Sequence, residues 1–119
     1  MITHGHHDHY AGAYDVIQLL IQEGLCSDRP QVYKNVNDHL QTDKNRLEEH
    51  PELENYLFNI GEGDVFSIEG NSKLSVIETP GHIDDHLCFM LEEAGEETMM
   101  FTGDHIIGAD SVNYCLLIE

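Results

Sequence analysis

The segment HGHHDH at residues 4–9 places four histidines and an aspartate within six consecutive positions. Imidazole nitrogens and carboxylate oxygens are good ligands for zinc and similar divalent cations. On a helix, the two-residue spacing of His4 and His6 would point their side chains about 200° apart, which excludes the helical zinc motif. On a loop that follows a strand, both rings can reach one ion. Asp8 and His9 can then bind a second ion close to the first.

Two later segments also place potential metal ligands directly after a predicted strand. Thr79-Pro80-Gly81-His82 places a histidine on a tight loop after a predicted strand, and Thr102-Gly103-Asp104-His105 does so with an aspartate and a histidine. Loops held at the ends of sheet strands are common locations for catalytic metal ligands. Cys26, Cys88 and Cys115 are too widely spaced for a structural zinc site of the CxxC kind, and we expect reduced thiols.

The pattern of apolar residues predicts one α/β domain with a mixed or antiparallel sheet. With 119 residues, the chain is long enough for a single core. The helix expected at 11–23 carries a stripe of Val16, Ile17 and Leu20, which we assign to core packing. The acidic stretch 37–55 should form one or two helical turns broken at Pro51. Strands are expected at 31–33, 56–58, 65–69, 74–79, 86–92 and 98–102, with a hairpin turn at 70–72.

The charge of the chain argues against binding to phosphate backbones. Five Lys and Arg residues oppose 23 Asp and Glu residues, which gives a net charge of −18. So negative a surface repels nucleic acid. Four of the five cations fall in one segment, where they form either a weak RNA-facing patch or, as we favour, an ordinary solvated surface. They are Arg29, Lys34, Lys44 and Arg46.

The three motifs together resemble the metallo-β-lactamase superfamily. HGHHDH matches its HxHxDH signature, and His82 and Asp104 follow in the order of that family. The segments TPGHIDDHLCFML at 79–91 and FTGDHIIG at 101–108 most resemble the endoribonuclease branch known as beta-lactamase-like protein two. Glyoxalase II-type thioesterases share the first motif and are the nearest alternative. The resemblance implies an α/β fold, as part of an αββα sandwich with a mixed sheet and flanking helices.

The resemblance also assigns a role to each matching residue. A first zinc would be held by three histidines and a second by Asp8 and His9, with Asp104 bridging both ions; Asp8 and His82 are the candidate catalytic residues. A zinc-activated hydroxide would hydrolyse phosphodiesters in single-stranded RNA or, as the alternative, a small ester or thioester. The implied metal ligands are His4, His6, Asp8, His9, His82 and Asp104.

The chain departs from the family at both ends, so residues 1–119 resemble a partial domain. The family has strands before the first motif and a further metal-ligating histidine after Asp104, whereas no histidine follows His105 here. We therefore expect one strong and one weakened zinc site, an inactive fragment being the non-enzymatic alternative. An incomplete sandwich would also expose apolar surface, which predicts marginal stability and self-association. The family resemblance suggests the mitochondrial matrix or the cytoplasm, and no membrane segment is expected.

Several residues near the motifs have two possible roles. His86 and His105 can hydrogen-bond a ligand carboxylate or serve only the fold. Asp84 and Asp85 can orient the loop after His82 or lie in solvent. His7, at the variable position of the first motif, is expected to be exposed.

Overall fold

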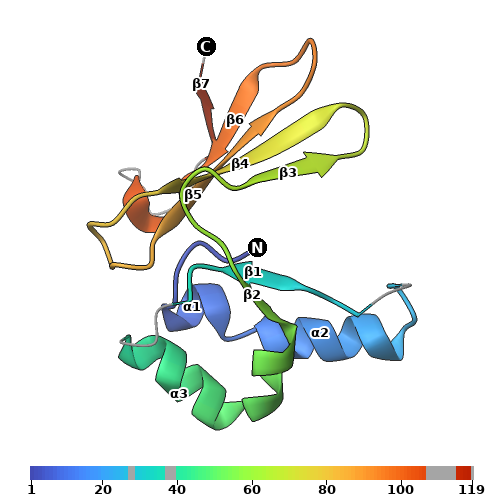
Figure 1. The fold of residues 1–119 in the computed structure, drawn as a ribbon, viewed down its shortest axis with the longest axis vertical. Helices are drawn as coiled ribbons and strands as arrows, with labels where there is room; N and C mark the ends of the chain where they lie inside the picture. The colour runs from blue at the N-terminus through green and yellow to red at the C-terminus, as the bar shows by residue number, and fades with distance from the viewer. Residues whose placement is uncertain (27–28, 37–39, 107–114, 119) are drawn as a thin grey trace.

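The computed structural model describes residues 1–26, 29–36, 40–106 and 115–118 as a mixed α/β fold (Figure 1). The first half is mainly helical and contains α1 (His7–Tyr10), α2 (Ala13–Gln22), β1 (Val32–Lys34), α3 (Gln41–Glu49), the 3-10 helix η1 (Pro51–Tyr56) and β2 (Leu57–Asn59). The second half is mainly strand and contains β3 (Val65–Ile68), β4 (Ser72–Glu78), β5 (Leu87–Glu92), β6 (Thr98–Phe101), the 3-10 helix η2 (Gly103–His105) and β7 (Cys115–Ile118).

The second half forms an antiparallel sheet in the order β3-β4-β5-β6-β7. Its strands follow the predicted segments within two residues, except that the sequence analysis predicted no strand at β7. The turn between β3 and β4 places Gly70 and Asn71 at φ values of 84° and 63°. Two successive residues in this left-handed region form the tight hairpin turn that glycine and asparagine favour. The hairpin predicted at 70–72 is therefore confirmed.

The first half packs its helices around a two-stranded parallel sheet, β1-β2. In Figure 1 these elements lie together at one end of the molecule, and the five-stranded sheet lies at the other. Pro51 ends the α3 segment and begins η1, as predicted, because proline lacks the amide proton that would continue an α-helix. The core of this half consists of Ile2, Tyr10, Ile17, Val32 and Leu53.

A second core cluster joins the two halves. It contains Ile60, Val76, Leu87 and Phe89, and Tyr33 of β1 packs against it. A backbone hydrogen bond crosses the same junction, since Leu87 N–H donates to Thr3 O at 2.7 Å, and Ile60 N–H donates to Lys34 O at 3.0 Å in continuation of the β1-β2 pairing. Strand β1 and the start of the chain are thereby fixed against the five-stranded sheet.

The prediction that the whole stripe of α2 is core was wrong. Only Ile17 is buried, with 2% of its surface exposed, whereas Val16 is 56% exposed and Leu20 is half-buried. A helix packed on one side buries a narrow face, so periodicity alone cannot tell which edge of the stripe faces solvent. Val16 and Leu20 line an open apolar cavity of about 490 Å³. None of the described helices has the length and apolar character needed to cross a membrane.

Replacing Leu53 by alanine should destabilise the fold. Leu53 is fully buried in the helical half, so Leu53→Ala should lower the free energy of unfolding by about 2–5 kcal/mol in a urea titration. Leu25, at 69% exposure, offers the matched control, and Leu25→Ala should change the value by less than about 0.5 kcal/mol. Equal effects of the two substitutions would contradict this placement of the core.

Candidate metal centre

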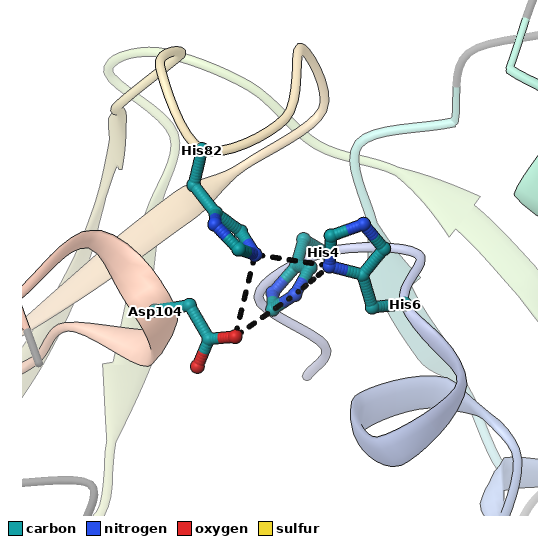
Figure 2. Close-up of side chains that lie close together, drawn as sticks. All are labelled: His4, His6, His82 and Asp104. Carbon is teal, nitrogen blue, oxygen red and sulfur yellow. Dashed lines mark hydrogen bonds and ion pairs between the residues drawn. The ribbon is translucent and has the colours of Figure 1, made fainter. Parts of the chain in front are cut away.

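Three imidazole nitrogens from distant segments converge at one point (Figure 2). His6 Nδ1 lies 3.0 Å from His4 Nε2 and 2.9 Å from His82 Nε2. His4 and His6 come from the chain start before α1, whereas His82 comes from the loop between β4 and β5. His4 is fully buried and His82 is exposed. The cluster therefore has a buried floor and an open side.

Asp104 on η2 completes this cluster and reaches a second one. Its Oδ2 atom lies 3.3 Å from His82 Nε2 and 3.7 Å from His4 Nε2. Its Oδ1 atom lies 3.2 Å from His9 Nε2. The two oxygens of one carboxylate thus face two different groups of donors, which is the arrangement that a bridging ligand requires.

The second group consists of Asp8, His9 and Asp104. His9 Nε2 lies 3.5 Å from Asp8 Oδ2, and the Asp8 side chain is 78% exposed. Both residues belong to α1, whereas the sequence analysis placed the entire motif on a loop. The helical turn begins at His7, because His6 O accepts hydrogen bonds from His9 N–H and Tyr10 N–H. This turn places the His9 ring beside that of His4, with 4.2 Å between ring centroids, and brings His9 Nε2 to Asp104 Oδ1.

His86 packs against the buried side of the first cluster. Its ring is fully buried and stacks on that of His4, with 4.9 Å between ring centroids. Its Nε2 atom accepts a hydrogen bond from Asp104 N–H at 3.1 Å, so its proton resides on Nδ1, which lies 2.8 Å from Thr79 Oγ1. His86 therefore contacts a candidate ligand residue, but through the backbone amide of Asp104 and not through a ligand carboxylate, which was the role considered from the sequence. His105 is exposed, as is His7.

Two glycines permit the close packing around the donors. Gly103 has a φ of 50°, and a Cβ atom there would lie 2.8 Å from His86 Nε2 and 2.9 Å from Thr3 Cβ. A Cβ atom on Gly5 would lie 2.7 Å from Thr42 Oγ1. A side chain at Gly103 would push the Asp104 segment away from His86 and Thr3, and one at Gly5 would push the His4–His6 segment away from Thr42 on α3.

The environment of the cluster keeps its buried histidines neutral. Burial, reinforced by the neighbouring His9 and His86, lowers the pKa of His4 from 6.5 to about 4. Burial also lowers the pKa of His86, with His82 and His105 acting in the same direction. Only a neutral imidazole can offer a lone pair to a cation. His4 is thus in its ligand-competent form at neutral pH.

The donor set fits a metal of the zinc type. Zinc sites are commonly tetrahedral, with zinc–nitrogen distances of about 2.0–2.1 Å that separate the ligand nitrogens by about 3.3 Å. The observed separations of 2.9 and 3.0 Å lie close to that value. In the first cluster, His4, His6, His82 and Asp104 offer four atoms within 4.8 Å of one another, whereas the second group offers three.

The structure thus brings together all six residues that the motifs singled out. The sequence analysis missed the burial of charged groups beside them. Lys34 is fully buried and Arg46 is 7% exposed, so the prediction that both lie on the surface was wrong. Asp85 is fully buried as well and forms an ion pair with Lys34. Burial of a charge depends on a partner distant in the sequence, which composition cannot show.

Converging imidazoles and a shared carboxylate at the end of a sheet define this α/β protein as a candidate metalloenzyme. No protein-family model matches the chain. It is 36% identical over 91% of its length to an atrochrysone carboxyl ACP thioesterase of Passalora fulva, of which it spans 26%. It is also 36% identical, over 91% of its length, to an atrochrysone carboxyl ACP thioesterase of Claviceps purpurea and to the lactamase-like protein aptB of Emericella nidulans. The chain spans 27% of the length of each of these two proteins.

These matches and the His/Asp cluster support the metallo-β-lactamase superfamily, and the mixed α/β fold is consistent with part of its fold. The chain spans about a quarter of the length of these relatives. Their names are those of thioesterases and lactamase-like proteins, not of endoribonucleases. The similarity thus favours the thioester alternative over the RNA-cleaving prediction, and nothing supports RNA binding or a mitochondrial location.

Acid should destabilise the metal-free protein through His4. Between pH 6.5 and about 4 the unfolded chain binds a proton on this residue that the folded chain does not, so stability falls as pH falls through this window. In a metal chelator, the free energy of unfolding should drop by about 2 kcal/mol from pH 7 to pH 5. Urea titrations at both pH values test this, and His4→Asn should reduce the difference. An identical difference in His4→Asn would contradict the assignment.

Proposed function

We propose that this chain carries the metal centre of a metallo-β-lactamase-type hydrolase that cleaves thioesters. The observation that carries the proposal is the convergence of His4, His6 and His82 on Asp104 Oδ2, with Asp104 Oδ1 facing His9. The relatives that bear the name of thioesterases support the choice of bond. The geometry alone is that of a hydrolytic metal centre and suits several electrophiles.

In this proposal His4, His6, His82 and Asp104 would hold a zinc ion, and Asp8, His9 and Asp104 would hold a second one. Zinc bound there would lower the pKa of a water molecule and polarise the carbonyl under attack. Thr3 fixes the orientation of the His4 ring, because its Oγ1 atom lies 3.1 Å from His4 Nδ1 and leaves Nε2 for the ion. His86 holds the Asp104 backbone, so the carboxylate stays aimed at both groups.

The distribution of charge favours a thioester over RNA as the substrate. Lys34 and Arg46 are buried, and Lys73 pairs with Glu92 at 2.8 Å. The chain therefore presents few cations to a phosphate backbone against its net charge of −18. A thioester carbonyl is neutral and its binding needs no such cations. The exposed His82 lies on the open side of the cluster, where an acyl group can approach.

Zinc titration of the metal-free chain should show one tight site and one weaker site. Four donors surround the first position and three surround the second. His82→Ala should weaken the tight site by at least about tenfold, because it removes a direct ligand. His7→Ala is the control, since His7 is exposed and belongs to neither group. Two sites of equal affinity would contradict the ranking, and no binding would refute the metal centre.

The zinc-loaded chain should hydrolyse acyl thioesters and leave RNA intact. S-lactoylglutathione, an acyl N-acetylcysteamine thioester and a short single-stranded RNA can be assayed side by side. Thioester cleavage should stop on chelation and fall at least about 100-fold in His82→Ala, with His7→Ala unchanged. Cleavage of the RNA without cleavage of either thioester would reverse the choice of substrate. Absence of turnover with zinc bound would refute the hydrolytic proposal for this chain.

A further inference from the structure

A network of buried charges lies directly beside the candidate metal centre. Lys34 on β1 and Asp85 on the loop before β5 are both fully buried, and Asp43 on α3 is 4% exposed. Lys34 Nζ donates hydrogen bonds to Asn35 O at 2.7 Å, to Asp43 Oδ2 at 3.0 Å and to Asp85 Oδ2. All three donors of the ammonium group are therefore used.

The network reaches both sides of the metal-ligand cluster. Asp85 lies three residues after His82, and its Oδ2 atom lies 3.1 Å from where a Cβ atom of Gly5, between His4 and His6, would be. Lys34 Nζ also lies 5.6 Å from the ring centroid of Tyr10, the last residue of α1. Lys34 thus contacts the segments that carry each group of candidate ligands.

The Lys34–Asp85 ion pair crosses the junction between the two halves of the fold. His4 and His6 come from the helical half, whereas His82 comes from the five-stranded sheet, and Figure 2 shows them meeting from opposite sides. The ion pair joins the same two halves on the side of the protein interior. Within the described part of the chain, Asp85 Oδ1 has no hydrogen-bond partner, so Lys34 is the group that offsets the charge of Asp85.

The position of this network is better explained by a role in orienting the two ligand-bearing segments than by a contribution to the stability of the fold. Replacing a buried ion pair by apolar side chains of similar size is often neutral or stabilising. Its geometry, however, is constrained, because the three ammonium hydrogens are donated to acceptors on three different residues. A network that combines little net stability with fixed geometry suits the task of placing two loops relative to each other.

We propose that Lys34 is a positioning residue: through Asp85 it holds the His82 loop against the His4–His6 segment and so sets the spacing of the metal ligands before any metal binds. The inference rests on the proposed metal centre for its functional meaning. The part that concerns the metal-free fold is independent of the metal, because the contact between Lys34 and Asp85 needs no ion.

The first arm of the test measures the junction in the metal-free protein. The amide of Leu87 donates to Thr3 O across the junction, and its hydrogen exchange reports separation of the two segments. In Lys34→Met this amide should exchange at least about tenfold faster than in the original chain, beyond the change seen at amides of the helical core. Lys73→Met, which removes an exposed lysine, should leave the rate unchanged.

The second arm measures zinc affinity by competition with a chelating dye. Lys34→Met should weaken the tight site about 10- to 100-fold, the range found when groups that orient metal ligands are removed. Leu53→Ala destabilises the helical core without touching the network, so its zinc affinity should stay within about threefold of the original. Lys34→Met combined with Asp85→Asn should recover part of the affinity, because Asp85 then no longer carries a buried charge that has lost its ammonium partner.

The proposal would be overturned if Lys34→Met kept both its zinc affinity and the hydrogen-exchange rate of its Leu87 amide within threefold of the values in the original chain. A loss of affinity that Leu53→Ala reproduces at equal stability would overturn it too, because the effect would then be general destabilisation. Should Lys34→Met fail to fold, Asp85→Asn keeps the side-chain volume and carries the same comparisons. If the original chain binds no zinc, the metal centre fails, while the exchange measurements still decide whether Lys34 fixes the junction.

Discussion

The candidate centre depends on the meeting of donors from two separately packed halves. His4, His6, Asp8 and His9 belong to the helical half, and His82 and Asp104 belong to the five-stranded sheet. Nitrogen lone pairs held about 3 Å apart repel unless a proton or a cation lies between them. Each half therefore needs independent support close to the cluster. The second core, the backbone bond from Leu87 to Thr3 and the Lys34 network provide it.

The carboxylate of Asp104 links the two groups of donors and is itself held by its backbone. Its amide donates to His86, and the ring of His86 stacks on that of His4. Moving either histidine would therefore displace the carboxylate, and a Cβ atom on Gly103 would do the same. A series of contacts through His86 thus couples Asp104 to His4, the most buried residue of the first cluster. Such coupling explains why a small disturbance at the junction should be felt in both groups.

The sequence predicted the donors better than it predicted their surroundings. The motifs together with the family resemblance were enough to select the six residues that meet in space, and alternating apolar residues with glycine turns were enough for four of the sheet strands. Local patterns could not show that α1 begins at His7, that Val16 faces an open cavity, or that β7 adds a fifth strand. The burial of Lys34 escaped prediction for the same reason, since Asp85 lies 51 residues away.

Residues other than the candidate metal ligands distinguish a phosphodiester substrate from a thioester substrate. Histidines and carboxylates around two cations can activate water against either electrophile, so the HxHxDH motif carries no information on the substrate. A polyanionic substrate needs exposed cations along its path, and here two of the five cations serve the interior. The same burial that places Lys34 beneath the ligands removes it from any surface that could attract RNA. The burial of Lys34 at the junction is therefore compatible with the proposed thioester substrate, whose carbonyl is uncharged.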